Sequence, residues 1–265
     1  MSKGASLRRS ILLTVIGLCI FQALLVGLVA ISFRVRPTTV RAYLIILVAA
    51  HAALLTFLWV MQHDFWLLEQ QRPLSRVNLP NVLTLSRLSS TPTVLYLLIL
   101  SERYDIVPVM IIFTSLVFLT DLFDGRVSRR LRQRTRIGRY LDSISDYAIL
   151  GAVSIAFVHH GLISVWVFVV VLFRLIAMGL GMGALLLIQG SVDASSTWWG
   201  KASVFSMMVL LAASLLKLIV PLQPEIATAT SILETVVAAV VVISAVEKGS
   251  ILYSNFKRLL DTKAR

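Results

Sequence analysis

The sequence predicts an all-α integral membrane protein, on the basis of its composition and the length and pattern of its apolar runs. The chain of 265 residues is 58% hydrophobic and 14% charged, with a mean hydropathy of +0.88. Soluble domains average about 45–50% apolar and about 25% charged residues, so one water-soluble core cannot bury this excess. The runs are long and do not alternate with polar residues, as strands of a membrane β-barrel would.

Candidate spanning segments follow from these runs, because a membrane-spanning helix needs about 20 mostly apolar residues. The candidates are Ile11–Phe33, Ala42–Met61, Val82–Leu100, Val107–Leu122, Tyr140–Val158, Leu162–Ile188, Ala202–Val220 and Ile226–Val246. The first run is too long for the apolar region of a secretory signal, and no small-residue cleavage site follows it. We therefore predict eight retained helices.

The distribution of basic residues predicts the orientation and the surface that the protein meets. Arg126–Arg139 contains seven arginines, which places this segment on the cytoplasmic side. Arg34, Arg36 and Arg41 fall on the outer side in this arrangement, against the rule. The chain has 25 Lys and Arg against 13 Asp and Glu, and in a membrane protein this excess favours anionic lipid headgroups over nucleic acid. Cys19, the single cysteine, excludes an intramolecular disulfide.

A polar, proline-bounded stretch divides the chain into two predicted domains. Gln70–Pro80 reads QQRPLSRVNLP and separates the second apolar run from the third. We interpret residues 1–76 as a two-helix N-terminal membrane addition with a linker. Residues 77–265 then form a core of six helices.

Four aspartates form the most informative cluster. Asp121 and Asp124 are three residues apart, and Asp142 and Asp146 are four apart, so each pair shares one helix face. The 17 residues between the pairs allow one helix to end and the next to begin beside it. Ionisable groups at membrane depth are costly and indicate function. Hard divalent cations such as Mg²⁺ or Mn²⁺ would relieve the repulsion between converging carboxylates. The alternative is a structural network with the neighbouring arginines.

The spacing of this cluster resembles a known family signature. The residues from Asp121 to Arg129 read DLFDGRVSR, and those from Gly138 to Asp146 read GRYLDSISD. The pattern is similar to that of the CDP-alcohol phosphatidyltransferase family, D-x2-D-G-x2-A-R-x8-G-x3-D-x3-D, and departs from it at Ser128, where the family has Ala. Upstream, NLPNVLTLSR from Asn78 to Arg87 resembles the NxPNxLTxxR opening of the phosphatidylglycerophosphate-synthase branch.

The resemblance implies a reaction and a set of site residues. Such enzymes transfer a phosphatidyl group from CDP-diacylglycerol to an alcohol at the cytoplasmic membrane face, and they release CMP. Two divalent metal ions, Mg²⁺ or Mn²⁺, would be held by Asp121, Asp124, Asp142 and Asp146, and Asp146 would also act as the general base. Contacts to the CDP-lipid are implied for Asn81, Thr84, Arg87, Gly125, Arg129, Thr135 and Gly138. The glycines would let the nucleotide approach the backbone.

The acceptor alcohol is predicted from weaker signals. Glycerol 3-phosphate is the expected acceptor, and inositol phosphate, a phospholipid such as phosphatidylglycerol and an amino alcohol are the alternatives. Arg174 lies within an apolar run, where it binds the acceptor phosphate or forms a salt bridge with Glu234. Lys201 lies in a stretch similar to the GKxKT of the same branch, with Ser203 and Val204 replacing Lys-Thr. It binds an anion or extends to the membrane interface.

Three further points complete the sequence-based predictions. A divalent-cation transporter is the rival function, although the glycine spacing has no role in transport. Both a monomer and a homodimer are compatible with the sequence. Because Ile11–Met61 supplies no metal-ligand spacing, we predict that deletion of Met1–Gln70 leaves catalysis largely intact.

Overall fold

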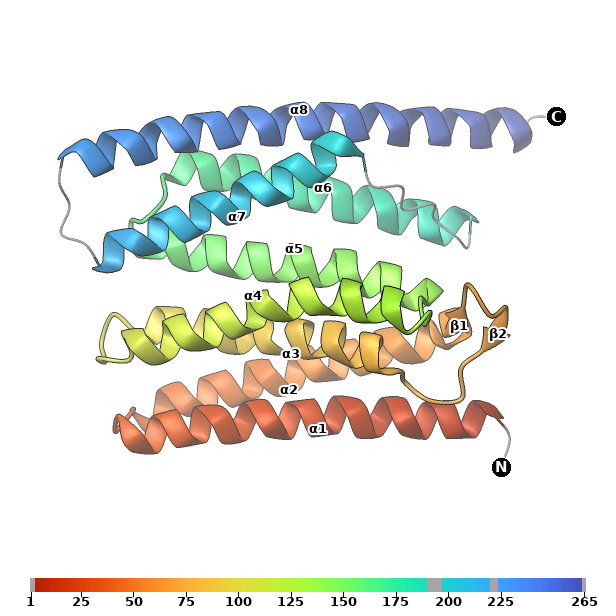
Figure 1. Cartoon of the computed structure of the whole chain (residues 1–265), viewed down its shortest axis with the longest axis horizontal. Coiled ribbons are helices and arrows are strands. Elements are labelled where there is room, and N and C mark those ends of the chain that lie inside the picture. Colours follow the sequence, from red (N-terminus) through yellow and green to blue (C-terminus); the bar gives the residue numbers. More distant parts are fainter. Residues whose placement is uncertain (1–2, 190–196, 220–223, 264–265) are drawn as a thin grey trace. The chain divides into compact units, whose positions relative to one another are not determined.

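The structure is a computed structural model that describes residues 3–189, 197–219 and 224–263, and it confirms the all-α class (Figure 1). Within the described residues, each of the eight apolar runs coincides with a helix to within a few residues. The helices are α1 (Lys3–Ser32), α2 (Pro37–Val60), α3 (Leu79–Leu100), α4 (Val107–Arg130), α5 (Arg136–His159), α6 (Val165–Gln189), α7 (Trp198–Ile219) and α8 (Pro224–Lys263). Between α2 and α3 lie a short 3-10 helix, η1 (Gln62–Asp64), and two strands, β1 (Trp66–Leu67) and β2 (Arg72–Pro73).

Five helices of the described part are long and apolar enough to cross a membrane. These are α1, α2, α3, α5 and α8, whereas the apolar segments of α4 and α6 are shorter, at Val107–Thr120 and Val165–Gly181. The chain is therefore an integral membrane protein, as the composition predicts.

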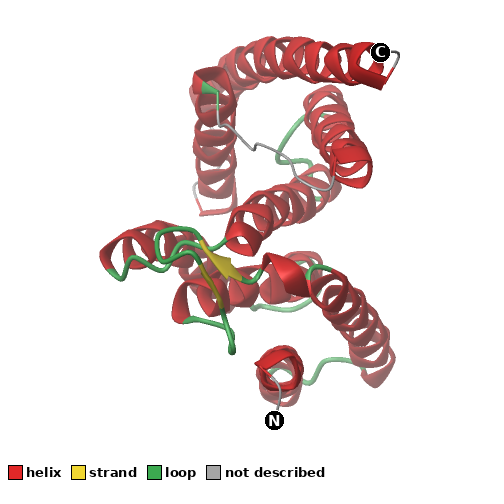
Figure 2. Cartoon of the chain, turned by 90° about the vertical axis from the view of Figure 1, so that its right-hand side faces the viewer, coloured by secondary structure: helices red, strands yellow, loops and turns green. Residues whose placement is uncertain are grey.

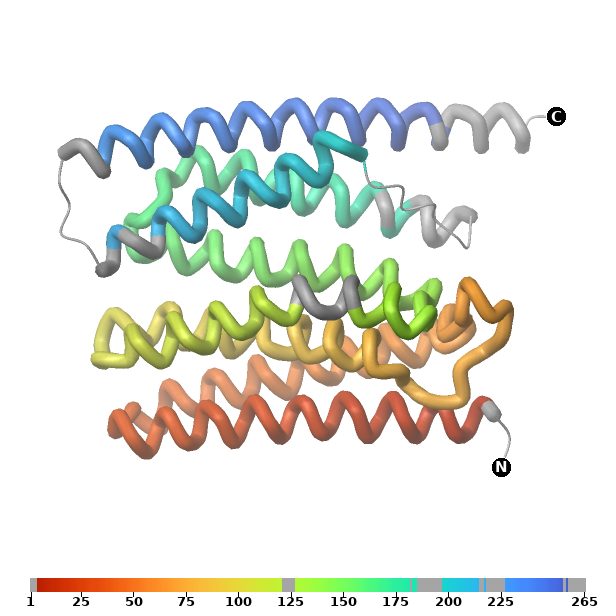
Figure 3. Tube along the Cα trace, viewed as in Figure 1, coloured from red at the N-terminus to blue at the C-terminus, as the bar shows by residue number. Residues whose placement is uncertain are grey.

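The helices group into two compact units, Met1–Ala152 and Val153–Arg265, which divide within α5. The first unit contains α1 to α4, the short strands and most of α5. The second contains the end of α5 with α6, α7 and α8, where α6 and α7 pack on α8 (Figure 3). This division differs from the domain boundary expected at residue 76, which remains a prediction.

In the first unit, α1 and α2 pack against each other and against α3. Val26 of α1 and Tyr43 and Leu47 of α2 form a buried cluster. The Tyr43 ring lies 4.6 Å, centroid to centroid, from the ring of Tyr96 on α3. Apolar and aromatic packing therefore joins the N-terminal helices to the third helix.

Buried hydrogen bonds reinforce this packing. The amide of Gln22 donates to Ser90 Oγ at 2.8 Å and accepts from Thr93 Oγ1 at 2.7 Å. His51 Nδ1 lies 2.8 Å from the Leu47 carbonyl oxygen, so it carries the proton, and in the neutral ring Nε2 accepts from Ser89 Oγ at 2.8 Å. Because unpaired polar groups are costly inside a membrane protein, these bonds fix how α1 and α2 sit on α3.

The segment between α2 and α3 makes specific contacts, most of them before the predicted linker Gln70–Pro80, in which the side chains of residues 70–73, 75 and 76 are exposed. Phe65 and Leu67 are buried, and the Leu74 amide donates to the Phe65 carbonyl oxygen at 2.8 Å. Leu67 forms an antiparallel bridge with Thr135, and the Leu68 amide donates to the Arg134 carbonyl oxygen at 2.9 Å. This short hairpin, yellow in Figure 2, therefore pairs with the loop that joins α4 to α5.

The end of α4 shapes the same loop. The Gln133 amide donates to the Ser128 carbonyl oxygen at 3.0 Å, and the Arg132 amide donates to the Arg129 carbonyl oxygen at 3.2 Å. These two bonds define a Schellman motif, whose left-handed position is usually glycine. Here Arg132 occupies that position with φ of 52°. The motif turns the chain sharply toward Thr135 and α5.

Candidate active site

A buried arginine gathers the polar side chains of α3 and α5. Arg87 is 1% exposed, and its Nη2 lies 3.0 Å from Asp142 Oδ1 and 3.2 Å from Asp146 Oδ1. Nη2 and Nε also donate to Ser145 Oγ, at 2.6 and 3.0 Å. Asp142, Ser145 and Asp146 share one face of α5, as their spacing requires. A charge at this depth is stable because the carboxylates compensate it.

The start of α3 and the start of α5 meet in a second polar contact. Thr135 Oγ1 donates to Asn81 Oδ1 at 2.9 Å and accepts from the Gly138 amide at 2.9 Å. A Cβ on Gly138 would lie 2.7 Å from Thr135 Oγ1 and 2.8 Å from Asn81 Oδ1. The close approach of these side chains therefore requires glycine here. The approach of a nucleotide to the same residue remains a prediction.

Local sequence explains why α3 presents these residues. Pro80 lies in the first turn of α3, where a missing amide hydrogen has no cost. Asn78 precedes the helix, and its side chain makes no capping bond but donates through Nδ2 to the Gln133 carbonyl oxygen at 2.9 Å. The start of α3 is thereby tied to the loop after α4. Arg87, two turns further along α3, is buried and does not extend to the membrane surface.

The structure brings together part of the predicted site. Asn81, Arg87, Thr135, Gly138, Asp142 and Asp146 lie in the two contacts described above. Thr84 is buried on α3, where its Oγ1 donates to the Pro80 carbonyl oxygen at 3.2 Å. Arg129 is exposed at the end of α4. The backbone of Asp121, Asp124 and Gly125 belongs to α4, and their side chains lie outside the described residues.

The donor chemistry of the site fits a hard divalent cation. Asp142 and Asp146 aim one oxygen each at the same point, the Arg87 guanidinium, so a positive charge is already stabilised there. The Asp142 side chain is 54% exposed, which leaves it open to a further ligand. Carboxylate oxygens are the ligands that Mg²⁺ prefers. Among the described residues no group of three metal-ligating side chains occurs, and a complete metal site would draw on Asp121 and Asp124.

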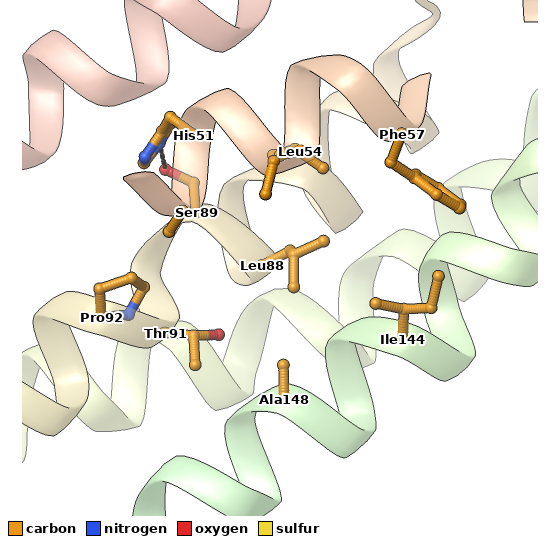
Figure 4. A pocket seen from close by; sticks show the side chains of 11 residues that line it. His51, Leu54, Phe57, Leu88, Ser89, Thr91, Pro92, Ile144 and Ala148 are labelled. Carbon is orange, nitrogen blue, oxygen red and sulfur yellow. Dashed lines mark hydrogen bonds between the residues drawn. The ribbon is translucent and has the colours of Figure 1, made fainter. Parts of the chain in front are cut away.

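An apolar cavity of about 330 Å³ lies within the first unit. Its walls come from α2, α3 and α5 (Figure 4). Leu88 and Ser89 follow Arg87 directly on α3, while Ile144 and Ala148 alternate with the aspartates on α5. Leu54 and Phe57 of α2 close the opposite side. The polar site and the apolar cavity therefore use the same two helices, but the α5 residues that line the cavity lie on the opposite face of that helix from the aspartates.

The second unit contains the other buried arginine that the sequence singles out. Arg174 on α6 is 1% exposed, and its Nη2 lies 3.4 Å from Ser244 Oγ on α8. Ser203 of α7 donates to the same Oγ at 3.3 Å. The alternative of a salt bridge to Glu234 is wrong, because that carboxylate lies 3.9 Å from Lys217 Nζ and accepts from Ser164 Oγ at 2.5 Å.

The predicted Lys201 lies close to this cluster in the fold. Lys201 is exposed in the first turn of α7, directly after Gly200. A Cβ on Gly200 would lie 2.9 Å from the Lys248 Cε of α8, one turn beyond Ser244. Arg174 and Lys248 therefore lie near each other in the second unit, and Lys201 is the residue after the glycine that Lys248 contacts.

Sequence reasoning missed Ser145, Ser203, Ser244 and Lys248. Ser145 lies three residues after Asp142, so the helical period alone places it on the aspartate face. The same argument finds Lys248 from Ser244. No sequence signal indicates that Ser244 meets Arg174, because that contact depends on how α6 and α8 pack.

The sequence model of the CDP-alcohol phosphatidyltransferase family matches residues 77–246 of the chain. The match covers more than half of the sequence, from the segment before α3 to a point within α8. It leaves α1, α2 and the strands outside.

Curated relatives support the same assignment. An Aquifex aeolicus protein named CDP-diacylglycerol–glycerol-3-phosphate 3-phosphatidyltransferase is 32% identical over 143 residues, which cover 53% of this chain and 77% of the relative. A Mycobacterium tuberculosis protein named "probable phosphatidylglycerophosphate synthase" is 30% identical over 167 residues, or 62% of this chain and 78% of the relative. A Drosophila melanogaster protein named "probable cardiolipin synthase (CMP-forming)" is 28% identical over 99 residues, which cover 37% of this chain and 30% of the relative.

Proposed function

Because the chain belongs to the CDP-alcohol phosphatidyltransferase family, it is a transferase of phospholipid biosynthesis, and we propose that its substrates are CDP-diacylglycerol and glycerol 3-phosphate. The observation that carries the proposal is the convergence of Asp142, Ser145 and Asp146 on Arg87, in helices that also line an apolar cavity. A substrate with a charged diphosphate and two acyl chains needs both environments. We place this site on the cytoplasmic face, following the arginines of the α4–α5 segment.

The proposed reaction is a displacement at phosphorus. A hydroxyl oxygen of glycerol 3-phosphate forms a bond to the phosphorus next to diacylglycerol, and the bond from that phosphorus to the CMP oxygen breaks. Asp146 accepts the proton of the attacking hydroxyl, and CMP leaves with the electron pair of the broken bond. Arg87 fixes the positions of the Asp142 and Asp146 carboxylates through its Nη2. Mg²⁺ or Mn²⁺ bound by the four aspartates would neutralise charge on the diphosphate.

The remaining residues bind and orient the two substrates in this proposal. The nucleotide would contact polar groups where the starts of α3 and α5 meet, at Asn81, Thr135 and Gly138. The apolar cavity between α2, α3 and α5 suits an acyl chain of the lipid. In the second unit, Arg174, Lys201 and Lys248 supply the positive charge that an acceptor phosphate requires.

The test measures CMP release by the purified full-length protein with CDP-diacylglycerol and a panel of acceptors. We expect release with glycerol 3-phosphate and a lipid product with the mass of phosphatidylglycerophosphate. Excess EDTA should abolish the release, and Mg²⁺ or Mn²⁺ in excess of the chelator should restore it. Undiminished release in EDTA would overturn the metal assignment.

A second acceptor is included because several relatives carry the name of a cardiolipin synthase. Phosphatidylglycerol would take the place of glycerol 3-phosphate in the same displacement, and the product would be cardiolipin. Release of CMP with phosphatidylglycerol but not with glycerol 3-phosphate would replace the proposed acceptor and leave the chemistry unchanged. Inositol phosphate and an amino alcohol complete the panel.

A further inference from the structure

A groove beside the start of the N-terminal helix α1 has no role in the proposed reaction. It has a volume of about 920 Å³ and lies between the first three turns of α1 and the segment before α3. The lining residues are Ser6, Arg9, Ser10, Leu13, Thr14, Ser75 and Arg76. The Val77 amide donates to Ser10 Oγ at 3.0 Å, which joins the two walls. All seven lining residues lie outside residues 77–246, which the family model matches.

The groove concentrates positive charge and hydroxyl groups. Arg9 and Arg76 are exposed and pair with no acidic side chain among the described residues. Arg8, by contrast, is engaged, because its Nε donates to Gln62 Oε1 at 2.8 Å. Hydroxyls of Ser6, Thr14 and Ser75 also line the groove. Two guanidinium groups with hydroxyl donors are the chemistry that binds a phosphate ester.

The groove also has a polar end and an apolar end. Its α1 residues recur every three or four positions, so they form one face that runs from the start of the helix into its apolar stretch. Leu13 is 61% exposed on this face, in a helix long and apolar enough to span the membrane. A ligand that lies here meets arginines at the membrane surface and leucine below it. An amphiphile matches that gradient, whereas a free phosphate would use the upper end alone.

We propose that this groove binds one anionic phospholipid, with its phosphate between Arg9 and Arg76 and an acyl chain along Leu13. The bound lipid would bridge α1 to the segment that leads into α3, the helix that carries Arg87. Each basic residue near an anionic membrane surface contributes about 1 kcal/mol, which is roughly a fivefold change in affinity. The two arginines together would therefore contribute about 30-fold.

The test is native mass spectrometry of the full-length protein in detergent, titrated with phosphatidylglycerol in the absence of CDP-diacylglycerol. We expect the Arg9→Gln, Arg76→Gln double variant to bind one phosphatidylglycerol fewer at concentrations that saturate the wild type. The matched control is Arg36→Gln, Arg41→Gln, which removes two exposed arginines at the other end of α1 and α2. This control should bind phosphatidylglycerol as the wild type does.

Three further measurements identify the ligand. Phosphatidylcholine with the same acyl chains should bind more weakly at this site, and millimolar glycerol phosphate should not displace phosphatidylglycerol. A phosphatidylglycerol with a photoreactive acyl chain should label the α1 peptide that contains Leu13, and the double variant should lose this label. Equal binding by the double variant and the wild type, equal binding of phosphatidylcholine, or displacement by glycerol phosphate would each overturn the proposal. CMP release by the double variant checks that it is folded.

Discussion

The two compact units each bury one arginine, but they surround it differently. Arg87 in the first unit lies between two aspartates of α5 and contacts Ser145. Arg174 in the second unit lies against Ser244, which also meets Ser203. Both side chains are 1% exposed. The first arginine therefore organises carboxylates, whereas the second lies among hydroxyls and other cations.

The difference suggests a division of labour between the units. A guanidinium that already neutralises carboxylates holds catalytic and metal-ligating groups in place. In the proposed reaction, Arg174 of the second unit contributes charge to the binding of the acceptor phosphate. We therefore expect variants in the first unit to change turnover and variants around Arg174 to change the use of the acceptor.

The largest effect is expected for Asp146→Asn. The amide cannot accept the proton of the attacking hydroxyl, and loss of a general base lowers kcat by about 10²–10⁴-fold. Steady-state CMP release at saturating substrates measures this. Asp105→Asn is the control, because Asp105 is exposed in the loop between α3 and α4. A kcat of Asp146→Asn within a factor of two of the wild type would show that another group is the base.

The second effect concerns the N-terminal helices. The sequence predicts that deletion of Met1–Gln70 leaves catalysis largely intact. The contacts predict the opposite, because the deletion removes the partners of Ser89, Ser90 and Thr93 on α3 and the bridge from Leu67 to Thr135. We expect most of the CMP release per folded molecule to be lost. Full activity of a monodisperse truncated protein would support the original prediction.

The third effect separates the second unit from the first. In the proposed reaction, Arg174→Gln would remove a charge-assisted contact to the acceptor phosphate, and such a contact is worth about 1.5–3 kcal/mol, or roughly 10- to 100-fold. We expect the KM for glycerol 3-phosphate to rise by this factor, while the KM for CDP-diacylglycerol stays constant. Arg174→Lys, which keeps the charge, should restore part of the affinity. A fall in kcat alone would indicate that Arg174 supports the fold.

These comparisons also show what the sequence can predict. Apolar run length found all eight helices, because each run must satisfy its backbone within the helix. The spacing of the aspartates placed Asp142 and Asp146 on one face of α5. The sequence did not predict that Arg87 meets them, that Ser244 meets Arg174, or that Leu67 pairs with Thr135. Those contacts join residues about 55 to 70 positions apart, and local periodicity carries no information at that range.

The fourth effect compares two helix glycines. Gly138→Ala forces Thr135 Oγ1 and Asn81 Oδ1 away from distances below 3 Å, which weakens the hydrogen bonds between the starts of α3 and α5. A lost hydrogen bond costs about 0.5–1.5 kcal/mol, and we expect a lower midpoint of thermal unfolding and a higher KM for CDP-diacylglycerol. Gly179→Ala on α6 has open space and should be neutral or stabilising. Equal effects of the two changes would contradict the packing role of Gly138.

The smallest effect concerns two helix ends that close in the same way. After α5, the Leu162 amide donates to the Phe157 carbonyl oxygen at 2.8 Å, and Gly161 takes the left-handed position with φ of 65°. After α4, Arg132 takes the equivalent position with φ of 52°. A side chain in this conformation costs about 1 kcal/mol relative to glycine. Arg132→Gly should therefore raise the midpoint of thermal unfolding by about 2–4 °C, and Gly161→Ala should lower it by a similar amount. Both changes keep the backbone hydrogen bonds. Circular dichroism in detergent measures the midpoint of thermal unfolding. A lower midpoint for Arg132→Gly would show that the arginine side chain stabilises the loop beside Thr135 by more than its backbone strain.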